Sequence, residues 1–333
     1  MIPVIDVRPS CGQDWETACA YNPGLAFFQT EHWLHVLAHA GMGYQDKSLK
    51  IAFSDRKEVL LPLMVNTIKL IFPFSEYRSL PFGTYGGPIS LDGSPVSPGH
   101  LTSILDWLVK QFNSRVNMIL YETAIPGETL PAGWKTAEAY THILDLKDGF
   151  EHIWNNCFMS KTRNQCRKAR KNGISSRSGD SLDDFRMFYD IYEKNTKIWG
   201  YRTPPIPFSI FKNLHNNQDH GVQLMLAEKD GRTVGGMLLL ANAKTVFYWL
   251  GAFLKEFKNL YPNNLLIEEV LRKCCEKGMR VFNFGASGPL ESVKKYKESF
   301  GAEIKKYHTL NYYPPAYYWC SRIKRVCGRL MKR

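Results

Sequence analysis

The sequence predicts an α/β protein with mixed sheets, built from two domains in tandem. With 333 residues the chain is long for one hydrophobic core, because cores stop growing at about 250–300 residues. Hydrophobic residues make up 44% and aromatic residues 13%, which is ample for packed cores and excludes wholesale disorder. In the second half, apolar segments separated by short polar turns precede a helix, a strand, a helix and a last strand, an order typical of a mixed α/β domain. The expected domains are residues 1–140 and 141–315, followed by a C-terminal basic helix at 316–333.

The formal net charge of +12 gives the protein a field that would concentrate anions. Nucleotides, RNA, diphosphate lipids and an acidic membrane surface all fit this field, and the charge does not choose among them. The eight cysteines show neither a C-x-x-C pair nor zinc spacing, so we expect idle reduced thiols and no metal site. The N-terminus lacks a signal-peptide pattern, and no stretch approaches about 18 consecutive apolar residues. We therefore expect a cytoplasmic protein, either free or peripheral at the inner face of the membrane.

The first domain is expected to begin with a short strand at 3–7 and an aromatic helix at 27–40, for which Thr30 is the expected N-cap. Three histidines lie at helical spacing in that helix, but no Cys or carboxylate cluster accompanies them, and we expect no metal there. Apolar segments separated by polar turns then predict strands, and a helix and a strand complete the domain. The strands are expected at 49–53, 59–65, 68–74 and 116–121, and the helix at 98–112.

The segment 78–88 (RSLPFGTYGGP) is too rich in Gly and Pro for a strand interior, so the chain must take a specific open path there. One interpretation is an acceptor groove between the domains, lined by Arg78, Tyr85 and the amides of Gly86 and Gly87, since loops on rigid scaffolds often carry function. The other interpretation is a structural crossover turn. The sequence leaves both open.

The second domain contains a long basic helix at 150–171. Within it Arg163, Arg167 and Arg170 share one face by their spacing of four and three. Such a face suits phosphates, which arginine binds with a bidentate fork, but a solvated basic helix explains the pattern equally well. The remaining elements are strands at 142–146, 174–177, 222–228, 233–241 and 245–251, and helices at 182–199, 209–216 and 265–278.

Residues 281–303 (VFNFGASGPLESVKKYKESFGAE) predict a strand, a tight turn and a short helix. The strand stops at Gly285, because the Gly-Ala-Ser-Gly-Pro run lets the backbone turn sharply. A helix over 291–300, with Ser287 or Ser292 as its cap, then presents three lysines near the carboxyl end of the strand. Three lysines at this place suit an anionic ligand or a negative charge that develops during a reaction. The plainer interpretation is a helix whose lysine face is solvated. The lysines are Lys294, Lys295 and Lys297.

Taken in order, the chain carries a Tyr-Pro-Asn segment, a helix that ends in Lys-Gly, a Phe-Asn-Phe-Gly strand end, and a lysine-rich helix followed by Phe-Gly-Ala-Glu. The residues are Tyr261, Pro262, Asn263, Lys277, Gly278, Phe282, Asn283, Phe284, Gly285, Lys294, Tyr296, Lys297, Phe300, Gly301, Ala302 and Glu303. This order resembles the second half of Fem-like (FemAB-type) transferases, a branch of the GNAT acyltransferase superfamily. The basic run at 161–169 and the segment 78–88 are similar to motifs of the same branch, which includes proteins from exopolysaccharide and peptidoglycan gene neighbourhoods.

The resemblance implies two tandem GNAT-like domains that form an N-acyltransferase. An acyl-CoA or aminoacyl-tRNA would serve as co-substrate, with no permanently bound cofactor, and the acceptor would be an amine on a cell-envelope glycan or peptidoglycan precursor. On this chain the resemblance implies catalytic roles for Lys297, which would stabilise the oxyanion, and Tyr296, which would shape the pocket. It also implies donor and phosphate-binding residues, namely Lys161, Arg163, Arg167, Tyr261 and Asn263.

Several points stay open. In the superfamily, a glycine-rich turn binds the pyrophosphate of coenzyme A. The segment GAFLKEFKNLYPNN occupies the corresponding place in this chain and lacks those glycines. This departure weakens the assignment of acetyl-CoA as donor and leaves aminoacyl-tRNA open. The general base stays unassigned, because Glu268 and Glu269 form a helical surface pair that is more often solvated than catalytic. A catalytically inactive scaffold binding an anionic polysaccharide or a membrane-linked precursor is the alternative, and an RNA-binding protein the third choice.

Residues 317–332 place aromatic and aliphatic side chains at helical spacing among Arg and Lys, and this pattern predicts an amphipathic helix. By resemblance this helix packs back on the first domain. The alternative is a membrane-surface helix whose cations meet acidic lipids.

Overall fold

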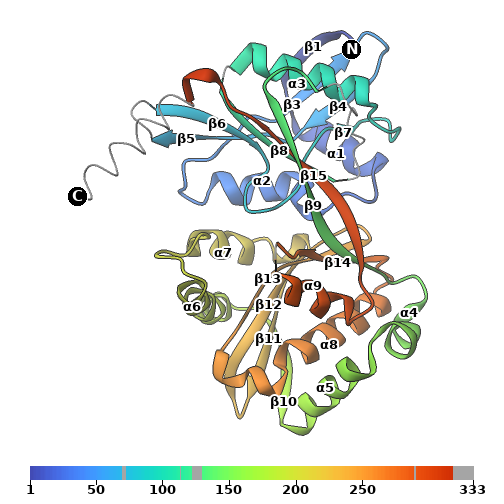
Figure 1. Ribbon diagram of the computed structural model, residues 1–333, viewed down its shortest axis with the longest axis vertical. Coiled ribbons are helices and arrows are strands. Elements are labelled where there is room, and N and C mark those ends of the chain that lie inside the picture. The colour runs from blue at the N-terminus through green and yellow to red at the C-terminus, as the bar shows by residue number, and fades with distance from the viewer. Residues whose placement is uncertain (70–72, 113, 122–129, 289, 318–333) are drawn as a thin grey trace. The chain divides into compact units, whose positions relative to one another are not determined.

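The computed structural model describes residues 1–69, 73–112, 114–121, 130–288 and 290–317, and the chain divides into two compact units (Figure 1). Unit 1 comprises Met1–Pro23, Phe28–Ala139 and the described residues from Lys306 on, and unit 2 comprises Gly24–Phe27 and Tyr140–Lys305. The second boundary therefore lies before the expected residue 315. The reason is β15 (Glu303–Tyr312), which pairs antiparallel with β8 (Arg115–Leu120) of unit 1.

Unit 1 contains two groups of strands. A four-stranded sheet has the order β1-β3-β4-β7, and a second group has the order β15-β8-β6-β5-β2. The remaining bounds are β1 Val4–Pro9, β2 Gln45–Asp46, β3 Leu49–Phe53, β4 Glu58–Leu61, β5 Met64–Lys69, β6 Pro73–Ser79 and β7 Ile89–Ser90. The expected single strand at 59–65 is wrong: it is divided between β4 and β5, which belong to different sheets, because Pro62 lacks the N–H that an unbroken ladder requires.

The core of unit 1 is organised by α3 (Pro98–Phe112), which has the bounds that the sequence predicts. Its apolar side chains recur at i, i+3, i+4 and i+7 and are fully buried together with residues from β3, β4, β8 and β15. These α3 residues are Leu101, Ile104, Leu105 and Leu108. Two further helices are α1 (Gly12–Tyr21), which was not predicted, and α2 (Glu31–Ala38), whose N-cap is Thr30 as expected. The 3₁₀ turn Phe27–Gln29 precedes α2.

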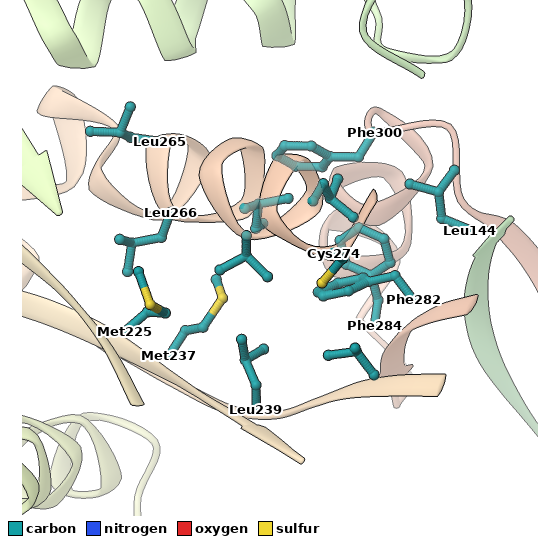
Figure 2. Packing of buried hydrophobic residues seen from close by; sticks show 14 of the residues in the cluster. Leu144, Met225, Met237, Leu239, Leu265, Leu266, Cys274, Phe282, Phe284 and Phe300 are labelled. Carbon is teal, nitrogen blue, oxygen red and sulfur yellow. The ribbon is translucent and has the colours of Figure 1, made fainter. Parts of the chain in front are cut away.

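Unit 2 is a mixed sheet with the strand order β10-β11-β12-β13-β14-β9 and helices on both faces (Figure 1). One face carries α5 (Ser160–Lys171) and α8 (Pro262–Glu276), and the other carries α6 (Leu182–Ile198) and α7 (Phe208–His215). Figure 2 shows how α8 buries Leu265, Leu266 and Cys274 against methionines and leucines of the sheet and the aromatic side chains of β14. The strands are β9 Trp134–Asp145, β10 Ile174–Gly179, β11 Val222–Lys229, β12 Arg232–Asn242, β13 Thr245–Phe253 and β14 Val281–Ala286.

The long helix expected at 150–171 is interrupted. It consists of α4 (Gly149–His152), a π-helical turn at Ile153–Cys157 and then α5, and Phe158 between them is extended. Phe158 is buried and packs edge-on against Phe300 at 5.1 Å between ring centroids. Arg163 donates to the carbonyl oxygens of Trp154, Asn155 and Phe158 and so satisfies backbone groups that the break exposes. Tertiary packing of one phenyl ring therefore overrides the helical pattern.

The strands β13 and β14 run parallel but stay paired only at one end. Their register extends from Thr245 opposite Val281 to Phe247 opposite Asn283, and the pairing of β13 with β12 skips Trp249. A bulge of this kind bends a strand and increases its twist, so the carboxyl-terminal halves of the two strands diverge. The 3₁₀ helix Lys255–Leu260 and α8 follow β13, and α9 (Glu291–Glu298) follows β14.

The C-terminal segment and the membrane-spanning capacity of the helices are the two remaining points of the fold. The amphipathic helix expected at 317–332 lies outside the described residues except for Tyr317. Among the helices within the described ranges, none is both long enough and apolar enough to cross a bilayer. The short 3₁₀ helix Gln218–His220 completes the elements of unit 2.

Candidate active site

A cavity of about 670 Å³ lies in unit 2 at the end of β13. Its wall is formed by Gly251, Phe253 and Leu254, by Lys255 and Lys258 after them, by the first residues of α8, and by residues of α5, α6 and α9. Most of the lining surface is apolar, and the polar groups come from asparagines, two lysines, two tyrosines, one glutamine and one serine. A cavity of this size and composition holds a small molecule or one end of a larger one.

The amino terminus of α8 opens into this cavity. Tyr261 has left-handed backbone angles (φ 59°, ψ 42°) and Pro262 occupies the first helical position, so the chain turns sharply from the 3₁₀ helix into α8. Both residues line the cavity, as do Asn263 and Asn264. Because the amino end of a helix carries a partial positive charge, this wall favours anionic groups.

Partly buried hydrogen bonds hold the asparagines of this wall in place. Tyr248 donates its hydroxyl to Asn263 Oδ1 at 3.1 Å, and Tyr296 of α9 donates to Asn264 Oδ1 at 3.3 Å. Asn264 in turn donates to Gln165 Oε1 of α5 at 3.2 Å. Burial raises the pKa of Tyr248 and Tyr296 well above the ordinary value, so both remain hydroxyl donors rather than proton acceptors. The network therefore preorganises the cavity but supplies no general base.

Cations and exposed aromatic surface mark the mouth of the cavity. Lys255 and Lys258 line it and lie on the 3₁₀ helix that precedes α8. Ile198 and Trp199, at the end of α6, line it as well and are 61% and 52% exposed. An indole and two ammonium groups that line the same cavity suit a ligand that combines a ring or an alkyl chain with phosphates.

Gly251 tests whether the shape of this wall matters. A Cβ atom built at Gly251 would lie 1.9 Å from Tyr248 Oη, so Gly251→Ala must displace the hydroxyl that holds Asn263. We expect Gly251→Ala to weaken ligand binding to the cavity at least tenfold, measured by isothermal titration with coenzyme A or tRNA. The matched control is Gly24→Ala in the same unit, where no atom lies within 4 Å of the added methyl group. Equal affinities for both variants would contradict the role of the cavity.

The donor residues expected from the sequence lie in different places. Tyr261 and Asn263 line the cavity, whereas Lys161, Arg163 and Arg167 are not among its lining residues. Arg163 is occupied by backbone carbonyls, as described above, and the guanidinium of Arg167 lies over the Trp154 ring, 5.5 Å from its centroid. Lys161 is exposed on α5. The basic face of α5 is thus partly structural.

Lys297 and Tyr296 are neighbours on α9, but their side chains contact different parts of unit 2. Tyr296 lines the cavity, while Lys297 is 8% exposed and its Nζ donates to the carbonyl oxygens of Gly285 at 2.7 Å and Ala286 at 2.9 Å. Burial lowers the pKa of Lys297 to about 8. An ammonium group has three N–H donors, so these two carbonyls leave one for a further oxygen atom. The solvated lysine face is therefore wrong for Lys297, although the exposed Lys295 fits it.

The expected acceptor groove at 78–88 is a tightly packed segment of unit 1. Gly86 donates its amide to Ile119 O at 3.0 Å, and Gly87 donates to Ser79 Oγ at 2.8 Å, so neither amide is open to a ligand. Tyr85 is buried and stacks on Tyr121 at 4.6 Å between centroids. The two glycines therefore fit the structural interpretation, since a Cβ at Gly86 would lie 2.2 Å from Ser79 Oγ.

Arg78 is bound to a buried carboxylate. Its Nη2 lies 2.7 Å from Glu76 Oε2, and Arg115 Nη1 approaches the other oxygen of Glu76 at 2.8 Å. Two guanidinium groups thus share one carboxylate that is 3% exposed. Arg78 is one-third exposed, so its outer edge faces solvent on unit 1.

Glu268 is not the surface residue that its helical position suggested. It is 2% exposed and accepts a bidentate pair from Arg170 at 2.7 and 2.8 Å. Glu269 lies 3.7 Å from Arg170 and accepts from Ser176. The oxygens of both carboxylates are occupied by these side chains, so their contacts are structural and neither carboxylate is placed to act as a base.

Sequence reasoning missed several residues of the cavity, chiefly Tyr248, Gly251, Lys255, Lys258 and Trp199. A signal for three of them was present: Gly251 and the two lysines stand in the segment that occupies the place of the expected phosphate-binding turn. The part of the chain that the structure describes contains no group of His, Cys, Asp and Glu suited to a metal ion.

Comparison with known proteins matches part of unit 2 to a family model. Residues 159–298 match the family model of the acetyltransferase (GNAT) domain. The chain is similar to the crystal structure of FemX, with 13% identity, coverage of 91% of this chain and 97% of that one, and a TM-score of 0.65. No curated protein matches it in sequence.

Two further solved structures share the fold. The C-terminal domain of a putative lysylphosphatidylglycerol synthetase from Agrobacterium fabrum has 11% identity, covers 93% of this chain and 96% of its own length, and has a TM-score of 0.55. A tandem GNAT protein from the clavulanic acid biosynthesis pathway has 11% identity, covers 92% and 97%, and has a TM-score of 0.51. Residues 159–298 therefore match a GNAT domain, and the whole chain shares the fold of FemX and of a tandem GNAT protein.

Proposed function

We propose that this protein is an N-acyltransferase that passes an acyl or aminoacyl group from an activated donor to an amino group on a cell-envelope precursor. The observation that carries the proposal is the cavity at the end of β13, with the amino end of α8 and residues of α9 in its wall. The activated end of a donor bound there would lie near the end of β14. The names of the structural relatives, FemX and a lysylphosphatidylglycerol synthetase, support an envelope-related acceptor.

Acyl transfer to an amine requires mainly that the reactants are positioned and that the developing negative charge is stabilised. The amine attacks the carbonyl carbon of an ester on tRNA or a thioester on coenzyme A, and negative charge develops on the carbonyl oxygen. Lys297, with its remaining N–H at the end of β14, is the group we propose for this oxyanion. Tyr296 would hold Asn264 and with it the wall that contacts the donor.

The direct test is a mass-spectrometric assay of transfer. Acetyl-CoA and alanyl-tRNA are offered as donors, and glucosamine and a lysine-containing peptide serve as acceptor probes. We expect an acceptor mass increased by one acyl group with one of the two donors. If the protein binds an anionic polysaccharide but no donor is consumed, the inactive scaffold replaces the enzyme.

The cations at the cavity mouth give a second test. The double variant Lys255→Gln/Lys258→Gln is expected to weaken donor binding about tenfold at low salt and to flatten its salt dependence, because two phosphate contacts are lost. Binding is measured by titration across a range of salt concentrations.

A matched control uses two cations that lie outside the cavity. Lys161→Gln/Arg167→Gln removes the same charge from exposed positions on α5. We expect a salt slope close to that of the wild type for this variant. If instead the α5 pair flattens the slope and the cavity pair does not, the phosphates lie on α5, as the resemblance implies.

A further inference from the structure

A cluster of polar side chains lies at the carboxyl end of β14 and outside the lining of the cavity. His142 of β9 is fully buried, and its Nδ1 lies 3.0 Å from Ser287 Oγ on the loop after β14. Its Nε2 is buried without a hydrogen-bond partner among the described residues, and it lies 3.8 Å from Glu298 Oε1 of α9. A buried imidazole nitrogen without a partner is costly, so this arrangement calls for an explanation.

Neighbouring hydrogen bonds hold the backbone of this loop in place. Asn283 Oδ1 accepts from Thr141 Oγ1 at 2.6 Å and from the Gly285 amide at 2.8 Å. Lys297 holds the carbonyl oxygens of Gly285 and of the next residue, Ala286. Ser287 follows directly and is 6% exposed, between two exposed neighbours. The hydroxyl of Ser287 thus lies close to the surface, with the imidazole behind it.

The charge state of His142 suits a proton acceptor. Burial lowers its pKa, and the ammonium groups of Lys297 and Lys294 act in the same direction, while the carboxylate of Glu298 opposes them. The neutral ring is therefore the ordinary state at neutral pH. With the serine hydroxyl donating to Nδ1, the ring proton sits on Nε2 and faces Glu298, which would stabilise the ring once it is protonated.

We propose that Ser287 and His142 form the proton relay of the transfer reaction, which rests on the function proposed above. The attacking amine forms a C–N bond to the donor carbonyl, and its proton passes to Ser287 Oγ while the serine proton passes to His142 Nδ1. When the tetrahedral intermediate collapses, the bond to the leaving sulfur or ribose oxygen breaks. The imidazolium returns its proton through Ser287 to that leaving atom, and the relay is restored.

The place of the relay supports this role. Lys297, the proposed oxyanion contact, binds the two residues that precede Ser287. The group that would stabilise negative charge and the group that would remove a proton therefore meet at one strand end, as acyl transfer to an amine requires. Neither Glu268 nor Glu269 offers this combination.

The test compares pH–rate profiles of the full-length wild type, Ser287→Ala, His142→Gln and the double variant, with the donor and acceptor probe that the mass-spectrometric assay identifies. We expect kcat to fall about a hundredfold or more in each single variant, with the KM for donor nearly unchanged. The kcat of the double variant should be no lower than that of the less active single variant, because the two residues act as one unit. The acidic limb of the wild-type profile should vanish in His142→Gln, and Ser287→Thr, which keeps a hydroxyl, should retain most of the activity.

Each outcome decides. If the wild type is inactive with every donor and acceptor, the proposed function fails and the relay with it. If the wild type is active and Ser287→Ala turns over normally, the relay alone is wrong. If His142→Gln loses activity with a lower melting temperature yet keeps the acidic limb, the Ser287–His142 hydrogen bond only attaches β9 to the loop, which also overturns the relay.

Discussion

Lys297→Met is expected to lower the rate of acyl transfer about a hundredfold or more at pH 7, the usual effect of removing one oxyanion contact. Lys297 is almost fully buried, and its ammonium group already binds two carbonyl oxygens beside the end of β14. A donor to a developing oxyanion must act when negative charge forms, so the loss should appear in kcat rather than in the KM for the donor. The measurement is steady-state kinetics by mass spectrometry.

The pH dependence distinguishes the charge of Lys297 from its structural bonds. Because its pKa is about 8, the wild-type rate should fall as the pH rises through that value and the ammonium loses its proton. Stability should change in the opposite direction. The unfolded chain keeps this proton up to its ordinary value of 10.5, so between about 8 and 10.5 the unfolded state binds more protons and the free energy of unfolding rises with pH.

Two variants complete this test. Lys297→Arg keeps a cation at high pH and should move the alkaline limb upward, whatever its effect on the maximal rate. Lys295→Met removes an exposed lysine from the same helix and should leave the rate within about twofold of the wild type. If Lys297→Met turns over normally, or if the alkaline limb stays in place in the arginine variant, Lys297 does not stabilise the oxyanion.

Arg170→Met is expected to destabilise the protein by about 2–3 kcal/mol. Removing one partner of a fully buried ion pair costs about 3–5 kcal/mol, because a buried charge is left uncompensated. Glu268 is such a charge, but Arg170 is 43% exposed and Arg272 lies 3.7 Å from the same carboxylate, which reduces the loss. Urea unfolding monitored by circular dichroism measures the effect.

The control for Arg170 lies one turn earlier on α5. Arg167→Met removes an exposed guanidinium that lies 5.5 Å from the centroid of the Trp154 ring, and we expect a loss of at most about 1 kcal/mol. The double variant Arg170→Met/Glu268→Met removes both charges and should recover most of the stability. Equal destabilisation by both single variants would show that the pair with Glu268 adds nothing beyond ordinary surface packing.

The sequence by itself determined the order of most elements and the bounds of several of them. The strand at Leu49–Phe53, the helix at Pro98–Phe112 and the meander of β11, β12 and β13 follow from periodicity and turn residues. These features depend on residues that are close in the chain. The same is true of the motifs at Tyr261, Asn263 and Tyr296, which the structure gathers around one cavity.

Contacts between distant residues decided the rest. Phe158 breaks a helix because its ring packs on Phe300, and Arg163 serves the carbonyls of that break rather than a ligand. The pairing of β15 with β8 assigns the last strand to unit 1.

The site itself was decided in the same way. Glu268 and Lys297 looked like surface charges in the sequence. Only the folded chain shows that Glu268 is buried against Arg170, 98 residues away, and that Lys297 is buried against backbone carbonyls 11 and 12 residues away. His142 and Ser287 lie 145 residues apart and carry no pattern that links them. Burial and hydrogen bonding are properties of the packed chain, so the residues that they convert from surface charges into a site are visible only in the tertiary structure.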